Sequence, residues 1–359
     1  MSPAARQLLP ALLLCLPVLA TAAVQVSSVP AQAWIEDLPD RQDLNFDLLL
    51  RNDGATALEL AAVEMEAFDA GGHLLLRRRL DGNGVRPSVM TVPDRNLAAG
   101  QSLTVFNPFP SLARDLPLAR LHYRLRFESP DGKQVQTAEL DLRPRRREQH
   151  ARLRLPLRGR VINDDGHDAQ AHHRRFDTSF APIAQLGFRG NFMRYAYDFV
   201  PVDAQGRMFH GGGADNHDYP GFGAELLAAG DGRIAALEGG RPDDRHFDES
   251  ELPRNRMALF GNYLVIDHGR GEYSLYAHLQ QGSVRVKVGD RVQRGDVVAR
   301  LGASGSAMFP HLHYELQDGP DALAEGLPSA FEGLRAWRGD HAVARARGTV
   351  DTGEIVESD

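Results

Sequence analysis

The stretch Gly302-Ala-Ser-Gly-Ser-Ala-Met-Phe-Pro-His-Leu-His-Tyr-Glu-Leu316 places His311 and His313 two residues apart at the start of a predicted β-strand. Side chains alternate between the two faces of a strand, so both imidazoles project from the same face. Two imidazoles on one face can bind a metal together, or one can bind it while the other transfers protons. This stretch therefore predicts a metal-dependent site on a β-sheet.

Two other short apolar runs carry side chains of the same kind. His278 ends the alternating run Tyr273-Ser-Leu-Tyr-Ala-His278, and Asp198 stands in Arg194-Tyr-Ala-Tyr-Asp-Phe199. Three histidines and a carboxylate on short strands are the groups that a hydrolytic zinc centre requires. We therefore expect these strands to meet in the fold.

Length and composition limit the class of protein. The chain has 359 residues, which favours about two domains, and its content of 42% apolar and 25% charged residues excludes global disorder. The formal net charge of −7 gives no reason to expect nucleic acid as a partner.

The first 23 residues have the pattern of a cleaved signal peptide. Arg6 precedes an apolar run from Leu8 to Leu19, and small residues follow at Ala20-Thr-Ala-Ala23. The run is too short for a stable membrane span, so we expect a secreted or periplasmic protein. The single cysteine, Cys15, lies inside this segment. Any zinc site in the mature chain must then use histidine and carboxylate ligands.

Residues 24–143 have the pattern of an immunoglobulin-like β-sandwich. Short alternating runs are separated by turn sequences such as Asn52-Asp-Gly54 and Pro130-Asp-Gly132. This part contains no cluster of catalytic residue types, so we interpret it as a spacer or as a candidate surface for a protein partner. A linker is predicted over residues 144–152, within and after an arginine-rich run.

Residues 153–340 form the second predicted domain, in which short strands alternate with long polar loops. Loops as long as those at 163–190 and 203–218 are uncommon in a compact domain and usually have a function. We therefore expect these two loops to flank the substrate. Residues 341–359 are predicted to be a C-terminal tail, frayed from Gly348 onward.

Read together, these pieces resemble the lysostaphin/LytM-type zinc endopeptidases, which cut peptidoglycan peptides. The resemblance covers about 40% of the chain and nothing before residue 150. Its motifs occur in the family's order and are Arg194–Phe199, Gly221–Ile234, Asn262–Gly269, Tyr273–Leu279, Val286–Gly302 and Pro310–Leu316.

The resemblance implies a fold, a cofactor and roles for individual residues. The fold would be a barrel-sandwich-type antiparallel β domain with long loops, and the cofactor would be Zn²⁺. Asp198 and His313 would be zinc ligands, and His278 and His311 would be the catalytic histidines. Asp267 and Glu315 are close enough in sequence to orient these imidazoles. The implied function is hydrolysis of amide bonds in peptidoglycan peptides.

One position departs from the family pattern. The family usually has a histidine four residues before the aspartate, and this chain has Arg194, which cannot ligate zinc. Either a loop histidine replaces the missing ligand, with His173 preferred over His172, or the site is degenerate. A degenerate site would make the protein a non-catalytic binder of cell-wall peptides or an activator of another hydrolase. For Arg194 itself we expect a surface salt bridge rather than a contact to a substrate carboxylate.

Overall fold

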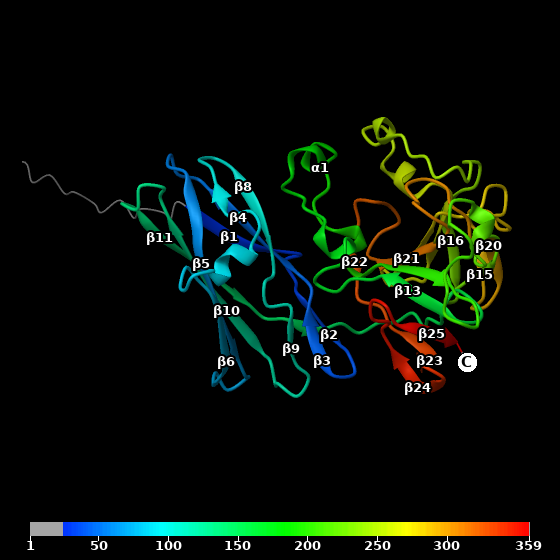
Figure 1. Cartoon of the computed structure of the whole chain (residues 1–359), viewed down its shortest axis with the longest axis horizontal. Coiled ribbons are helices and arrows are strands. Elements are labelled where there is room, and N and C mark those ends of the chain that lie inside the picture. Colours follow the sequence, from blue (N-terminus) through cyan, green and yellow to red (C-terminus); the bar gives the residue numbers. More distant parts are fainter. Residues whose placement is uncertain (1–23, 359) are drawn as a thin grey trace, which may run out of the picture.

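A computed structural model describes residues 24–358, which are built mainly from antiparallel strands. The predicted signal peptide, residues 1–23, lies outside this range. Figure 1 shows the strands of the N-terminal part on one side of the molecule and those of the C-terminal part on the other. Within the described range, no helix combines the length and the apolar character needed to cross a membrane.

Two sheets form most of the N-terminal part and share one apolar core. One sheet has the order β1 (Val24–Val29), β4 (Asp47–Asn52) and β8 (Ser102–Phe106). The other contains β11 (Val135–Leu142), β10 (Arg120–Glu128), β5 (Leu58–Phe68) and β6 (Leu74–Leu80), with β7 (Asn96–Leu97) beside β5. Alternate residues of β5 are buried, as expected for a strand with one face on a core. The immunoglobulin-like topology stays a prediction.

A third sheet, of four short strands, lies between the two halves of the chain (Figure 1). Its order is β12 (Arg145–Arg146), β2 (Trp34–Asp37), β3 (Arg41–Leu44) and β9 (Ser111–Ala113). β12 pairs with β2 in parallel, so the predicted linker contributes a short strand to the N-terminal part.

The C-terminal part is organised around an 11-stranded sheet and a two-stranded one. The large sheet has the order β19 (Arg291–Val292), β16 (Gly232–Glu238), β17 (Tyr263–Asp267), β18 (Tyr273–Ala277), β21 (Leu312–Gln317), β14 (Tyr197–Pro201), β13 (Val161–Asp165), β25 (Ile355–Ser358), β23 (Phe331–Arg338) and β24 (His341–Gly348), with β22 (Gly326–Leu327) beside β21. The two-stranded sheet pairs β15 (Glu225–Leu227) with β20 (Val297–Arg300). The predicted mostly-β fold class is confirmed.

Strand β21 is buried along its whole length because both of its faces are covered. Leu312, Tyr314 and Leu316 belong to the main apolar core of this domain. His313 and Glu315, on the opposite face, are also buried. The alternation thus places apolar side chains in the core and polar side chains in the site.

Strand register brings the predicted site residues together. In the antiparallel pairing of β14 with β21, Asp198 lies opposite His313. On the other side of β21, Ala277 lies opposite His313, so His278 follows directly at the end of β18. Three adjacent strands therefore supply Asp198, His313 and His278 to one region.

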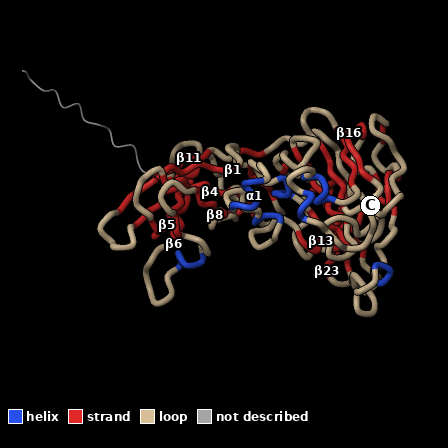
Figure 2. Tube along the Cα trace, turned by 90° about the horizontal axis from the view of Figure 1, so that it is seen from above, coloured by secondary structure: helices blue, strands red, loops and turns tan. Residues whose placement is uncertain are grey.

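The segment between β13 and β14 carries most of the short helices beside the site. It contains the 3-10 helix η2 (His173–Arg175), the helix α1 (Ala181–Gln185) and the 3-10 helix η3 (Phe192–Tyr195). Figure 2 shows these helices between the two regions of strands. The remaining 3-10 helices are η1 (Ser88–Thr91), η4 (Asn216–Asp218), η5 (Glu249–Glu251) and η6 (Arg256–Phe260).

The C-terminal residues differ from the predicted tail. β24 pairs with β23 along its length, and β25 pairs with both β23 and β13. Val356 in β25 is fully buried in the main core of the C-terminal domain. The sequence prediction failed here because residues 341–359 are rich in charged side chains and contain few apolar ones. Their strands form through tertiary packing, which the local sequence does not indicate.

Candidate metal and catalytic centre

Asp198 is surrounded by three histidines. Its Oδ1 lies 3.0 Å from Nδ1 of His313 and 3.5 Å from Nε2 of both His173 and His311. The Asp198 side chain is 9% exposed. A carboxylate this far from water needs cations or hydrogen-bond donors around it, and these imidazoles supply them.

His173 is held at its ring and at its main chain by two residues of the loop region. Its Nδ1 lies 2.8 Å from the carbonyl oxygen of Gly166, and the side-chain amide of Asn191 donates to the His173 carbonyl at 2.7 Å. Among the described residues, the buried Nε2 of His173 has no hydrogen-bond partner. An orphaned imidazole nitrogen facing a carboxylate is the arrangement that a metal ion would complete.

One buried group of side chains could hold a metal ion. His173, Asp198 and His313 each offer a ligand atom, and these atoms lie within 4.8 Å of one another. Two imidazole nitrogens and one carboxylate oxygen form a donor set suited to catalytic zinc, which uses three protein ligands. The residues present therefore fit the ion that the family resemblance implies.

His172 lies beside this group but in a different environment. It belongs to a second candidate group, Asp165, His172 and His173, and its Nδ1 pairs with the Asp165 carboxylate. The His172 side chain is 61% exposed, whereas that of His173 is 1% exposed. Burial and contact with Asp198 both favour His173 as the ligand.

The two remaining histidines are held by carbonyl groups through Nδ1. His278 Nδ1 lies 2.9 Å from the Ser304 carbonyl, and His311 Nδ1 lies 2.8 Å from the Phe309 carbonyl. In the neutral ring, a protonated Nδ1 leaves Nε2 as the free base. Their ring centroids are 4.7 Å apart, so the two bases lie side by side.

The backbone of His278 adopts an unusual conformation, with φ of 60°. Residues with a side chain rarely occupy this left-handed region, and where they do the site often has a function. Two backbone hydrogen bonds hold it: the His278 N–H donates to Phe260 at 2.9 Å, and its carbonyl accepts from Gly302 at 3.0 Å.

A close approach of two loops keeps Ser304 beside His278. Gly261 has φ of 62°, and a Cβ at this position would lie 2.4 Å from the backbone nitrogen of Gly305. Glycine at this position therefore allows the two loop segments to come into contact. The Asn262 N–H donates to the Ser304 hydroxyl at 2.9 Å.

Burial and neighbouring charges shift the pKa values of the candidate ligands Asp198 and His173. Burial raises the pKa of Asp198, but attraction by His173 and His311 and the contact with His313 outweigh it and hold the pKa well below its usual range. Burial lowers the pKa of His173 to about 3. A carboxylate and a neutral imidazole are the forms that bind metal.

Glu315 contacts the other side of His313, as the sequence predicted. Its carboxylate lies 3.8 Å from His313 Nε2. Burial opposes the charge on His313, yet the hydrogen bond with Asp198 and the nearby Glu315 carboxylate outweigh it and raise the pKa to about 10, so a metal ion bound by His313 would have to displace a proton from it. Asp267 was predicted to act in the same way, but its carboxylate accepts from Gly269 N–H in the following turn. That prediction is wrong because β17 ends in a tight turn that uses the Asp267 carboxylate.

One cavity of about 420 Å³ is lined by Asp198 and by the four histidines His173, His278, His311 and His313. One wall comes from the 163–190 loop, as predicted, including Asp164, Asp165 and Phe176. Other lining residues are Leu259, Phe260, Ser306, Met308 and Phe309. The 203–218 loop does not contribute to the lining, so the prediction of a groove between the two long loops holds for one side only.

Arg194 forms neither a surface salt bridge nor a contact open to substrate. Its side chain is fully buried and pairs with Asp47 of β4 at 2.7 Å and with Glu325. The sequence prediction was wrong because the partner Asp47 lies 147 positions away and belongs to the N-terminal part.

Two sets of contacts around the site have no signature in the sequence. The carbonyls of Gly166, Ser304 and Phe309 orient three imidazoles. A backbone carbonyl is common to every residue type, so its position could not be predicted. Asn191 was missed because a single asparagine in a polar loop has no periodic context.

Comparison with known proteins covers the second half of the chain. Residues 220–324 match the model of Peptidase family M23. The peptidoglycan DD-endopeptidase ShyB of Vibrio cholerae is 32% identical over 144 residues, which are 39% of this chain and 33% of that protein. ShyA of the same organism, also a peptidoglycan DD-endopeptidase, is 30% identical over 131 residues, 35% of this chain and 28% of that protein. The chain thus matches about a third of the length of either relative.

Two other similarities are more limited. The murein hydrolase activator EnvC of Escherichia coli is 38% identical over 58 residues, which are 16% of this chain and 13% of that protein. The catalytic domain of lysostaphin from Staphylococcus simulans aligns in structure with a TM-score of 0.24 and 22% identity, covering 39% of this chain and 79% of that one. The matched family segment contains His278, His311 and His313, and the predicted resemblance is confirmed: residues 220–324 are a domain of peptidase family M23.

Proposed function

We propose that this protein is a zinc metalloendopeptidase that hydrolyses amide bonds in peptidoglycan peptides, acting in the periplasm or outside the cell. The observation that supports it most is the presence of two kinds of histidine around one cavity. His173 and His313 join Asp198 in a buried set of ligand atoms, while His278 and His311 stand beside it. A metal-binding protein without catalysis would need only the first set.

The three ligand residues and the other two histidines have different roles in the proposed reaction. His173, Asp198 and His313 would hold Zn²⁺, which when bound acts as a Lewis acid and lowers the pKa of a water ligand towards about 7. One of His278 and His311 accepts the proton of the attacking water at Nε2. The other imidazole, protonated from solvent at Nε2, donates a hydrogen bond to the oxyanion of the tetrahedral intermediate. The first then passes its proton to the amine nitrogen, which leaves as the C–N bond breaks.

The cavity offers both apolar and charged contacts to a peptide substrate. Phe176, Met193, Leu259 and Met308 give its walls apolar surface, and the carboxylates of Asp164 and Asp165 lie at one side. Apolar walls with a few polar groups bind and orient an extended substrate. The choice of peptidoglycan as substrate is supported by the names of the Vibrio cholerae relatives.

The alternative is a cell-wall binder or hydrolase activator without catalysis. It was suggested by Arg194 at the position of a ligand histidine. The structure supports another explanation, because Arg194 is a buried partner of Asp47 and His173 faces Asp198 in its place. His278 and His311, which a pure binder would not need, also favour the enzyme.

Digestion of purified cross-linked peptidoglycan tests the proposal. We expect the zinc-loaded protein to convert cross-linked muropeptide dimers into monomers, measured by chromatography and mass spectrometry. A chelator should stop the reaction, and added Zn²⁺ should restore it. A zinc-loaded protein that binds the polymer and releases no product would establish the non-catalytic alternative.

A further inference from the structure

The carboxylate of Asp47 joins the N-terminal part to both segments that lead into the candidate metal ligands. It is 3% exposed, pairs with the guanidinium of Arg174, and accepts from Nη1 of Arg194 at 2.7 Å. Arg174 directly follows His173, and Arg194 lies four residues before Asp198. The Asp47 carboxylate therefore contacts the residue directly after the candidate ligand His173 and a residue four positions before the candidate ligand Asp198.

The two residues before Asp47 add contacts to the same segments. The carbonyl of Phe46 accepts from Nη2 of Arg174 at 2.6 Å, and the side-chain amide of Asn45 donates to the carbonyl of Arg194 at 2.6 Å. Backbone and side chain of Asn45-Phe-Asp47 thus fix both a guanidinium and a main-chain carbonyl.

The network continues to the strand that carries the third ligand. Arg194 also pairs with Glu325, whose carboxylate accepts from the Asn191 N–H at 2.9 Å. Asn191 in turn donates to the carbonyl of His173 at 2.7 Å. Gly326, next to Glu325, pairs with Gln317 at the end of β21, the strand of His313.

The charges of this network are balanced and lie away from water. Asp47 and Glu325 are matched by Arg174 and Arg194, and the two arginine side chains are 2% and 0% exposed. Buried ion pairs of this kind tolerate few alternative arrangements, because an unpaired buried charge is costly. They are therefore suited to fix the position of a loop.

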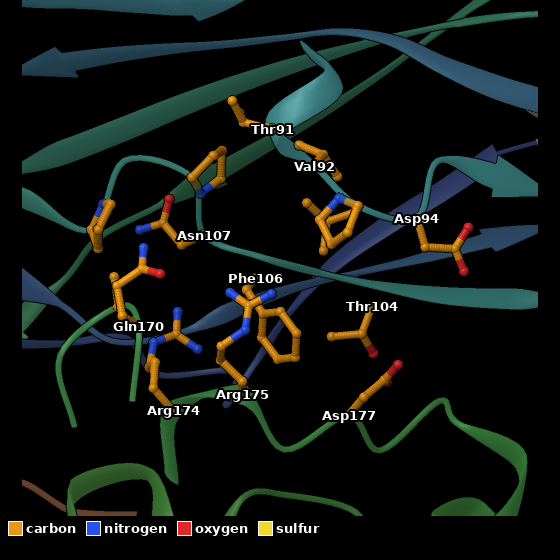
Figure 3. A pocket seen from close by; sticks show the side chains of 15 residues that line it. Thr91, Val92, Asp94, Thr104, Phe106, Asn107, Gln170, Arg174, Arg175 and Asp177 are labelled. Carbon is orange, nitrogen blue, oxygen red and sulfur yellow. The ribbon is translucent and has the colours of Figure 1, made fainter. Parts of the chain in front are cut away.

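Apolar packing does not fill the interface beside Arg174. A cavity of about 340 Å³ lies between β8 and the 169–177 segment, and Figure 3 shows Arg174 and Arg175 at its edge, with the Arg175 guanidinium beside the Phe106 ring, 4.7 Å from its centroid. Because side-chain packing is incomplete here, polar contacts position the segment that bears His173: those of Asp47, and farther along the loop those of Thr104 with Ser179 at 3.0 Å.

We propose that Asp47 is a positioning residue for the metal centre, through which the N-terminal part holds the loop that supplies His173. Arg194 occupies the place where the family pattern has a ligand histidine, so the ligand comes from a loop that needs an anchor. Asp47 provides this anchor. The inference rests on the proposed function, because it assumes that His173, Asp198 and His313 bind zinc.

Zinc affinity of the full chain tests this role. The dissociation constant for Zn²⁺ is measured by competition with a chromophoric chelator, and the visible absorption of the Co²⁺-loaded chain reports the ligand set. Asp47→Asn should raise the dissociation constant at least about tenfold and change the Co²⁺ spectrum, as loss of groups that orient metal ligands does in other proteins. Near-UV circular dichroism verifies that the variant is folded.

Arg41→Gln is the matched control, because Arg41 also joins the two halves of the chain. It pairs with Asp351 at 2.8 Å, outside the network of Asp47. We expect its zinc affinity to stay within twofold of the wild type. If Arg41→Gln weakens zinc binding as much as Asp47→Asn, general docking of the two parts explains the effect and the assignment to Asp47 is overturned.

The other outcomes are equally decisive. A folded Asp47→Asn chain with wild-type zinc affinity and Co²⁺ spectrum overturns the inference while leaving the proposed function intact. If Asp47→Asn does not fold, the charge-balanced double variant Asp47→Asn/Arg174→Gln takes its place, with the same expected loss of affinity. A wild-type chain that binds no zinc overturns the proposed function itself.

Discussion

Nδ1 of His313 lies 3.0 Å from Oδ1 of Asp198, although 115 positions separate the two residues in the chain. The pairing of β14 with β21 puts them opposite each other, and a shift by one residue would turn His313 to the apolar core. The candidate metal site therefore depends on strand register as much as on residue type.

His173→Ala should remove bound zinc, whereas His172→Ala should retain it. His173 is buried against Asp198, while His172 is mostly exposed and pairs with Asp165. Loss of one of three protein ligands leaves a donor set too small for tight binding. Elemental mass spectrometry of the purified variants gives the zinc content per chain. Zinc lost in His172→Ala and kept in His173→Ala would reverse the assignment.

The strands of the C-terminal domain could be predicted because each carries its own local signal. The run from His313 to Leu316 was predicted as a strand and lies in β21, and the run before His278 is β18; His311 and His278 themselves lie just outside these strands. Alternation of apolar residues and glycine-containing turns is readable without knowledge of partners. Which side chains meet also followed, because the motifs had the order of a known family.

Contacts between the two halves of the chain could not be predicted. Asp47 stands in Asn45-Phe-Asp47, which has the appearance of any strand start, and its role depends on Arg174 and Arg194 far along the chain. The exposed position expected for Arg194 followed from its residue type, since arginines are rarely buried without a partner. Only the three-dimensional structure supplies that partner.

The contribution of His167 to the free energy of unfolding should decrease as the pH rises from 6.5 to about 9. Its Nε2 lies 3.0 Å from Glu36 of β2. Burial opposes its charge, but the Glu36 carboxylate, the hydrogen bond from His167 Nδ1 to the Ala196 carbonyl and a smaller effect of Asp43 together raise the His167 pKa from 6.5 to about 9. The folded state then binds the proton more tightly than the unfolded state, so the stabilisation is complete below pH 6.5 and lost as pH rises through 9. It amounts to about 3 kcal/mol.

Thermal unfolding of wild type and His167→Gln at pH 6 and pH 9.5 measures this contribution. The difference between the two proteins should be larger at pH 6. Arg41 and Arg174 lie around the same site but keep their charge over this range. His210→Gln serves as the control, because His210 is 52% exposed and lies 3.7 Å from Asp203. A pH-independent difference for His167→Gln would contradict the ion pair with Glu36.

Val356→Ala should destabilise the protein by about 2 kcal/mol, since it removes two buried methyl groups and leaves a cavity. Val356 is fully buried in β25, between β13 and β23. Val343→Ala in β24, where the side chain is 47% exposed, is the matched control and should change stability by less than about 0.5 kcal/mol. Denaturant unfolding compares the two. Equal stability of both variants would restore the prediction of a frayed tail.

His311→Ala should lower the rate of peptidoglycan hydrolysis by at least about a hundredfold while zinc content stays near that of the wild type. His311 lines the cavity beside Asp198, but its Nε2 is 3.5 Å from that carboxylate and it is not one of the three buried ligand groups. Removing a general base or an oxyanion donor costs about 10²–10⁴ in rate. Product release and zinc are measured on the same preparation, with the exposed His217→Ala as control. Joint loss of zinc and activity would make His311 a ligand, and full activity would remove it from the catalytic machinery.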